Sequence, residues 1–368
     1  MKRNILLNPG PATTTDSVKE ALLVPDICPR EQEFGELTQD VLNKVVQVVN
    51  GELTHTAVIF SGSGTAGVEA ALSSVVPPEG KILILDNGAY GKRAETIIQA
   101  YGIPYCTHRL VWGDYPDVDT VEAIFKEDSE LTHFVFVHHE TTTGMLNPLP
   151  ELLELCRKYE IDSIVDAMSS YAGLPIDMRE LPIDYLISSS NKCIQGMAGT
   201  SFVIANKEKL AKTAEIPPRN LYLNLWGNHI YIEKTGQFQF TPPVQIVYAL
   251  NQALDEFFVE TQAGRTARYV KSYETLLDGL EIVGLELLLP KSQHSKLLTA
   301  IVEPDSPGYD FMEMHDYYYQ NDITIYPGKG AKQDTFRIAN IGEIDYRDML
   351  VFNKRLLQYF EEKKIIKI

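Results

Sequence analysis

The sequence predicts an α/β protein in which helices cover a mostly parallel sheet. Two observations carry this prediction. Short, nearly continuous apolar segments recur between residues 56 and 205, and segments with helical periodicity lie between them. Such alternation is typical of strand–helix–strand units, whose helices shield both faces of the sheet. The 368 residues, of which 44% are hydrophobic and 23% charged, suffice for one large and one smaller domain.

Six segments have the composition of buried strands. They are TAVIFS (56–61), KILILD (81–86), HFVFVHH (133–139), DSIVDA (162–167), DYLISS (184–189) and TSFVIA (200–205). Between them, PLPELLELCRKYE (148–160) places its leucines on one helical face. After about residue 245 a long helical pattern leads into mixed structure. We therefore predict an N-terminal segment at 1–15, a large domain at 16–255 and a small α+β domain at 256–368.

Charge and composition exclude several classes of protein. The net charge of −17, from 33 basic and 50 acidic residues, argues against nucleic acid as the main partner. No apolar stretch is long enough for a membrane span, and the apolar run near Met1 is too short for a signal peptide. The four cysteines are irregularly spaced, which argues against a zinc site. We expect a cytoplasmic protein with free thiols and no metal.

A glycine motif follows the first predicted strand. In FSGSGTAGVEAAL (60–72), Gly62, Gly64 and Gly67 form the pattern G-x-G-x-x-G ahead of a predicted helix. Asp86 ends the next strand about 20 residues later, where a dinucleotide-binding fold has its acidic residue. One interpretation is therefore an NAD-dependent dehydrogenase. The other is that the loop holds a different phosphate, since a small-residue loop after a strand is a weak signal.

Five predicted strands end in polar or aromatic residues that could form a site. These are Ser63, Gly64 and Thr65, then Tyr90, the hydroxyl cluster in ETTTG (140–144), Asp166, and Lys192. Each alone has a structural explanation: a turn, a packing aromatic, a helix cap or a surface lysine. Together they are more informative, because ligands of such sheets bind at the carboxyl ends of the strands.

This combination suits pyridoxal 5'-phosphate. That cofactor needs an amine for a Schiff base, here Lys192, and a carboxylate beside its ring nitrogen, here Asp166. Its phosphate needs donors at a helix N-terminus, which residues 63–65 could supply, and Tyr90 could stack on its ring. A nicotinamide site would leave Tyr90, Asp166 and Lys192 without a role. We therefore predict the pyridoxal-phosphate site.

Several longer segments resemble a known family. They are ILLNPGP, NGAYGKR, HHETTTGMLNP, IVDAMSS, DYLISSSNKCIQG, IYPGK and FRIANIGE, and the likeness runs from about residue 4 to residue 345. They are similar to the matching segments of the 2-aminoethylphosphonate:pyruvate aminotransferases, which belong to class V of the fold-type I pyridoxal-phosphate enzymes. The resemblance implies a seven-stranded, mostly parallel sheet in the large domain. It also implies Lys192 and Asp166 as the catalytic residues.

The resemblance assigns further roles residue by residue. Ser63, Gly64, Thr65, Tyr90, Thr141 and Asn191 match cofactor contacts, and Thr241 matches a residue that reaches the phosphate of the neighbouring subunit, which implies a homodimer. Arg337 matches the arginine that grips the acidic end of the substrate, and Asn8 and Gly10 would border it. A planar guanidinium suits a carboxylate and a phosphonate in turn.

The implied reaction exchanges an amino group between 2-aminoethylphosphonate and pyruvate, giving phosphonoacetaldehyde and L-alanine, in phosphonate degradation or, in reverse, biosynthesis. Three segments depart from the family pattern: DICPREQEF (26–34), Asn8 in place of a frequent threonine, and GMAGTS (196–201). They leave open an alanine:glyoxylate or serine-type class V aminotransferase.

Overall fold

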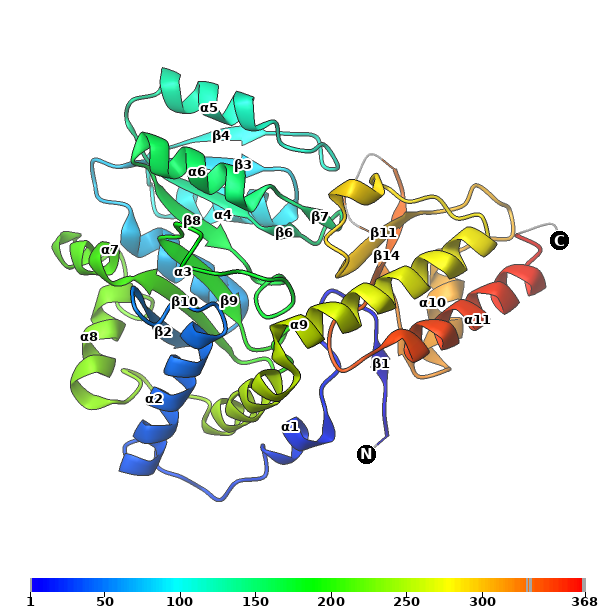
Figure 1. Cartoon of the computed structure of the whole chain (residues 1–368), viewed down its shortest axis with the longest axis horizontal. Helices are drawn as coiled ribbons and strands as arrows, with labels where there is room; N and C mark the ends of the chain where they lie inside the picture. Colours follow the sequence, from blue (N-terminus) through cyan, green and yellow to red (C-terminus); the bar gives the residue numbers. More distant parts are fainter. Residues whose placement is uncertain (1, 329, 331–332, 366–368) are drawn as a thin grey trace.

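A seven-stranded sheet forms the centre of the larger part of the molecule (Figure 1). The computed structural model describes residues 2–328, 330 and 333–365. In spatial order the strands are β2 (His55–Ser61), β10 (Thr200–Asn206), β9 (Tyr185–Ser189), β8 (Asp162–Asp166), β5 (Leu131–Val137), β3 (Lys81–Asp86) and β4 (Tyr105–Arg109). Strand β10 runs antiparallel to both neighbours, and the remaining neighbouring pairs are parallel. The predicted mostly parallel sheet is confirmed.

The six predicted strands all lie in this sheet, with two differences. The edge strand β4 was not among them, because its sequence YCTHR is only partly buried and lacks an apolar run. The predicted strand at 133–139 extends too far. The chain leaves the sheet after Val137, and His139 belongs to the short strand β6 (His139–Glu140), which pairs with β7 (Met145–Leu146).

Helices pack against the sheet in groups. Helices α3 (Gly64–Val75) and α4 (Ala89–Ala100) contact each other and several strands, and α5 (Val118–Glu127) contacts α6 (Leu149–Tyr159), which lies on β8. The others in this part are α1 (Asp16–Glu20), α2 (Gln32–Gln47), α7 (Lys207–Lys212), a 3-10 turn (Thr213–Glu215) and α8 (Leu225–Thr235). Apart from the edge strand β4, the strand interiors of the sheet are almost entirely buried, as parallel strands shielded by helices require.

The long helix α9 (Val244–Ile282) runs from the sheet toward a second group of elements (Figure 1). This group has its own apolar core. Its elements are a 3-10 turn (Lys291–Gln293), β11 (Leu298–Val302), α10 (Phe311–Tyr319), β12 (Ile323–Thr324), β13 (Tyr326–Pro327), β14 (Thr335–Ala339) and α11 (Tyr346–Glu362). The predicted domain boundary at 255/256 falls within α9, whose backbone is non-helical at Thr261. The division into domains stays a prediction.

The N-terminal segment joins the two parts. Strand β1 (Ile5–Leu6) pairs with β12 of the second group, whereas the Ala12 amide donates to the carbonyl of Asn191 beside the large sheet. Residues 7–11 therefore pass between β14 and the end of the large sheet at which β9 finishes. None of the helices in the described ranges is long and apolar enough to cross a membrane.

Candidate active site

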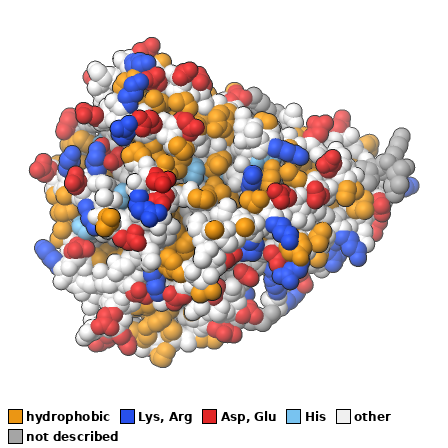
Figure 2. Space-filling view, in the orientation of Figure 1, with side chains coloured by type: hydrophobic (Ala, Val, Ile, Leu, Met, Phe, Trp, Pro, Cys, Tyr) orange, Lys and Arg blue, Asp and Glu red, His pale blue; other side chains and the backbone are white. Residues whose placement is uncertain are grey.

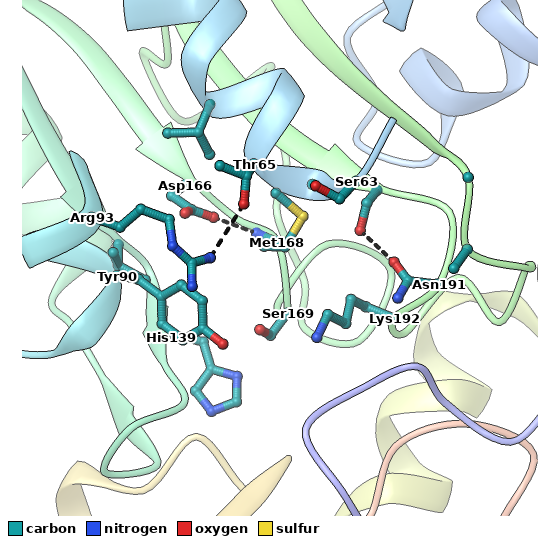
Figure 3. Close-up of a pocket in the computed structure, with 16 residues that line it drawn as sticks. Ser63, Thr65, Tyr90, Arg93, His139, Asp166, Met168, Ser169, Asn191 and Lys192 are labelled. Carbon is teal, nitrogen blue, oxygen red and sulfur yellow. Dashed lines mark hydrogen bonds between the residues drawn. The ribbon is translucent and has the colours of Figure 1, made fainter. Parts of the chain in front are cut away.

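A pocket opens at the carboxyl ends of β2, β3, β5, β8 and β9 (Figure 3). It brings together seven of the residues that the sequence singled out: Ser63, Gly64, Thr65, Tyr90, Asp166, Asn191 and Lys192. It is also lined by Val68, Arg93, Val137, His139, Met168, Ser169, Ser189, Ala198 and Gly199. The predicted strand ends thus meet in one cavity, because parallel strands finish at the same edge of the sheet.

Asp166 ends β8 with its carboxyl group buried in this pocket. Its Oδ1 accepts a hydrogen bond from the Met168 amide at 2.9 Å, which fixes the direction of the side chain. Burial raises the pKa of Asp166 to about 6, although the backbone bond and the charges of Arg93 and Lys192 oppose that rise. A cationic ring nitrogen beside this carboxylate would restore its charged form.

Lys192 follows β9 and is held in one direction. Its Nζ donates to the carbonyl oxygen of Pro9 at 2.7 Å. Burial lowers the pKa of Lys192 to about 8, Cys193 and Asp166 act in the opposite direction, and the positive charges of two arginines lower it further. A lysine with a lowered pKa can be a nucleophile and a general base near neutral pH.

The glycine motif brings α3 close to the site. Gly62 has a φ of +153°, a conformation that a residue with a side chain rarely adopts. A Cβ on Gly64 would lie 2.4 Å from the sulfur of Met168, and one on Gly67 would lie 3.1 Å from Ile187. Ser63 caps α3 without a side-chain hydrogen bond to the helix. The loop therefore presents a hydroxyl and a helix N-terminus to the pocket, a suitable place for a phosphate.

Asp86 does not take part in this pocket. Its Oδ2 lies 3.1 Å from Arg109 Nε, and its Oδ1 accepts from the Trp112 indole at 3.4 Å. The buried carboxylate is thus held in an ion pair with the partly exposed Arg109 and is not available to bind a ribose. The dinucleotide interpretation lacks its acidic residue.

A second pocket adjoins the first and shares Tyr90, Arg93 and Lys192 with it. It is also lined by Pro9, Gly10, Ala89, Thr142, Tyr326 and Arg337. Arg337 lies on β14 and is buried, and it makes no ion pair with a carboxylate in the described ranges. Its Nε donates to the Pro327 carbonyl and its Nη1 to the Thr141 carbonyl, both at 3.0 Å. Burial lowers the pKa of Arg337. Backbone carbonyls, and not a carboxylate, therefore hold the Arg337 guanidinium in place.

Several buried polar atoms around these pockets lack a partner. One is His139 Nδ1, whose residue lines the first pocket. The others are Asn8 Oδ1 and Thr141 Oγ1, whose residues line neither pocket but adjoin Pro9 and Thr142 of the second one in the chain. Such atoms carry a desolvation cost that a bound group can offset. Position 10 has room only for a glycine, since a Cβ there would lie 2.3 Å from Lys192 Nζ. These features fit a polar ligand beside the lysine.

Thr241 lies apart from the residues above. Its side chain is exposed, it lines neither pocket, and its carbonyl accepts from Ser61 Oγ of the same chain at 3.4 Å. Its predicted contact with a partner's phosphate stays a prediction. Asn191, by contrast, lies in the pocket, where its Oδ1 accepts from Ser189 Oγ at 2.9 Å.

The pocket residues that sequence reasoning did not single out include Arg93, His139 and Met168. Arg93 and His139 stand within NGAYGKR and HHETTTG, so the motifs contained them without marking them. His139 Nε2 lies 2.8 Å from Ser295 Oγ, a contact across the fold that no local pattern reveals.

Comparisons with known proteins agree with this geometry. The family described as "Aminotransferase class-V" matches residues 25–325. A 2-aminoethylphosphonate–pyruvate transaminase of Pseudomonas fluorescens is 37% identical over 99% of this chain and 98% of its own, and one from Klebsiella pneumoniae is 41% identical over 92% and 93%. The crystal structure of an alanine–glyoxylate aminotransferase from Nostoc sp. covers 98% of this chain and 96% of its own, with a TM-score of 0.91 and 25% identity. The chain therefore belongs to the class-V aminotransferase family, whose cofactor is pyridoxal 5'-phosphate.

Proposed function

We propose that the chain exchanges an amino group between 2-aminoethylphosphonate and pyruvate, giving phosphonoacetaldehyde and L-alanine. The observation that carries this proposal is the position of Lys192, which lines both pockets, with Asp166 in one and Arg337 in the other. The amine that would meet the cofactor thus also faces the place for an anionic substrate. The curated relatives named for this reaction support it.

The residues of the first pocket suit pyridoxal 5'-phosphate. Ser63, Gly64, Thr65 and Asn191 would hold its phosphate, Tyr90 would stack on its ring, and the unpartnered Thr141 hydroxyl would contact it. When bound, the cofactor supplies an aldehyde for the amino group and a ring that accepts the electron pair released at the substrate carbon.

The chain's own groups would hold and move protons. Lys192 Nζ would take the proton from the amine-bearing carbon and return it, which its lowered pKa favours. The Asp166 carboxylate would keep a proton on the ring nitrogen. Arg337 would hold the phosphonate of one substrate and the carboxylate of the other, and Gly10 and the nearby Asn8 would border that site.

A visible spectrum of the cofactor-loaded protein tests the proposal. We expect 2-aminoethylphosphonate to remove the visible band and pyruvate to restore it, with alanine and phosphonoacetaldehyde as products. Donors are then compared at equal concentration. Preference for alanine with glyoxylate, or for serine, would instead favour the second candidate, an aminotransferase like the structural neighbour from Nostoc.

We further propose that the active unit is a cytoplasmic homodimer. Thr241 is exposed and its backbone lies beside Ser61, which leads into the phosphate loop. Tyr222 donates to the Ser61 carbonyl at 3.2 Å, and Leu221 next to it is 73% exposed. Leu221 and Tyr222, which is 42% exposed, place two neighbouring exposed hydrophobic side chains beside the loop, where a second subunit would cover them. Light scattering at assay concentration tests this, since a fully active monomer would contradict it.

A further inference from the structure

Arg93 lies where the two pockets meet, and the proposed mechanism gives it no task. It projects from α4 beside Tyr90 and Thr65 (Figure 3). It lines the pocket that contains Asp166 and also the pocket that contains Arg337. Gly91 helps to place it, since a Cβ there would lie 2.5 Å from the Leu85 carbonyl and α4 could not pack so closely on the end of β3.

Within the described residues Arg93 is held in no ion pair, although its charge acts on the buried Asp166 carboxyl group and opposes the rise in the pKa of that group. Its Nη1 donates to Thr65 Oγ1 at 3.3 Å, and its guanidinium lies 4.8 Å from the centroid of the Tyr90 ring. No ion pair joins it to an acidic residue of the described ranges. Arg109, on neighbouring β4, differs because it binds both Asp86 and Glu95. Arg93 is therefore a cation that can still bind an anion.

Arg337 is the second such cation in the same pocket. Two of its donors are used by the Pro327 and Thr141 carbonyls, which leaves one edge of the guanidinium for a ligand. Both arginines lower the pKa of Lys192 through their positive charge, in addition to the larger effect of burial. Two positive charges therefore act on the amine where the substrate reacts.

We propose that Arg93 is a second anion-binding arginine, which with Arg337 selects a phosphonate over a carboxylate. This rests on the proposed function of the pocket. A phosphonate carries up to two negative charges on three oxygens, whereas a carboxylate carries one on two. Because Coulomb energy scales with the product of the charges, a second cation adds more binding energy for the phosphonate. The chain has a net charge of −17, and its acidic side chains are spread over the surface seen in Figure 2. An anionic substrate therefore depends on local positive charge in the pocket to bind.

Single-turnover kinetics of Arg93→Gln test the proposal. The cofactor-loaded enzyme is mixed with 2-aminoethylphosphonate or with L-alanine, and the decay of the visible band gives kcat/KM for each donor. We expect at least about a tenfold loss for the phosphonate, mainly in KM, and less than about threefold for alanine. Arg93→Lys should recover part of the loss. Equal losses for both donors, or no loss, would overturn the proposal.

Arg157→Gln is the matched control. It removes the same charge from the surface of α6, where the Arg157 side chain is 65% exposed and paired with Glu154. It should change kcat/KM for neither 2-aminoethylphosphonate nor L-alanine. A change in donor preference equal to that of Arg93→Gln would show that net charge alone, not Arg93, sets the selectivity, and would overturn the proposal.

A binding measurement separates this proposal from the proposed function. Ethylphosphonate and propionate are used as inhibitors of the alanine reaction. In Arg93→Gln we expect the inhibition constant of ethylphosphonate to rise at least about tenfold and that of propionate to stay within about threefold. If the wild type does not use 2-aminoethylphosphonate but this difference appears, the proposed function fails and the role of Arg93 stands. If the wild type does use 2-aminoethylphosphonate but Arg93→Gln weakens ethylphosphonate and propionate equally or not at all, the proposed role of Arg93 is wrong and the proposed function stands.

Discussion

Two halves of the site are built in different ways. The sheet half consists of residues at or shortly after the carboxyl ends of strands, namely residues 63–65, Tyr90, Asp166 and Lys192. The recognition half consists of Pro9, Gly10, Tyr326 and Arg337, which come from the N-terminal segment and the second group of elements. Neighbours in the chain fix the first half, as when the Met168 amide orients Asp166. Contacts between residues 183 and 196 positions apart fix the second half, through Lys192 with Pro9 and Arg337 with Thr141.

This difference separates chemistry from recognition. The sheet half would hold the cofactor and move protons, so a change there should affect every substrate alike. The recognition half would hold only the anionic end, so a change there should leave the bound cofactor as it is and alter how substrates bind. The following substitutions test that separation.

Replacing Lys192 by alanine should have the largest effect. We expect turnover to fall by at least about 10³-fold with both substrates, because the variant loses its nucleophile and its proton carrier. The fold should persist, since a buried amine with one polar contact contributes little to packing. Steady-state rates and circular dichroism measure the two effects, and Lys126→Ala on the surface of α5 is the control. Turnover like that of the wild type would remove Lys192 from the mechanism.

Asp166→Asn should lower turnover by about 10²-fold or more while the cofactor still binds. A neutral amide cannot keep a proton on the ring nitrogen, although it can still accept from the Met168 amide. The loss should be similar for the phosphonate and for alanine, since both use the same ring. Cofactor affinity and both rates are measured side by side. Activity within a few-fold of the wild type would show that Asp166 has another role.

Arg337→Lys should affect the recognition half alone. We expect kcat/KM to fall about tenfold or more for both 2-aminoethylphosphonate and pyruvate, because one charge-assisted bond of about 1.5–3 kcal/mol is lost. A lysine also cannot donate to the Thr141 and Pro327 carbonyls in the same geometry. The visible cofactor band should remain unchanged. A variant that unfolds, or one with unchanged kinetics, would assign Arg337 a structural role.

The two halves also differ in how far the sequence predicts them. Lys192, Asp166 and the loop at 63–65 could be predicted because each lies at or shortly after the end of a strand, and parallel strands end at one edge of the sheet. The edge strand β4 was missed because partial burial removes the apolar run on which strand prediction depends. The glycine motif predicted a phosphate loop, but the acidic residue that would have specified NAD is bound by Arg109.

The recognition half offered no such rule. Arg337 was singled out through a family resemblance. Its contact with the Thr141 carbonyl arises only when β14 packs against the loop that follows β6. The contact between Lys192 and Pro9 likewise depends on the path of the N-terminal segment. Arg93 was overlooked although it lies in a quoted motif, because nothing in the sequence shows that it lacks a carboxylate partner.

Glu140 tests the link between the two halves and should have the smallest effect on activity. This buried carboxyl group accepts from the Tyr90 amide at 3.3 Å and from the amide and hydroxyl of Thr142 at 3.0 and 2.6 Å. It therefore holds Tyr90 of the sheet half and the loop whose Thr141 carbonyl binds Arg337. Glu140→Gln keeps the acceptor for Thr142 and loses the one for Tyr90. We expect a loss of only a few-fold in kcat/KM.

The pH dependence of stability gives a sharper readout of the same variant. Burial raises the pKa of Glu140 to about 7, while Thr142 and the Tyr90 amide oppose that rise. Because the folded state holds this proton more tightly than the unfolded state, its contribution is complete below the unfolded pKa and is lost as pH rises through 7. The stability of the wild type relative to Glu140→Gln should therefore fall by about 2 kcal/mol between pH 5 and 8. Urea unfolding of both loaded proteins measures it. The exposed Glu154, whose pKa lies below its usual value, should give a flat difference in Glu154→Gln over this range. A flat difference for Glu140→Gln would mean that Glu140 is ionised in the folded state throughout, and that its charge acts on the nearby Arg337.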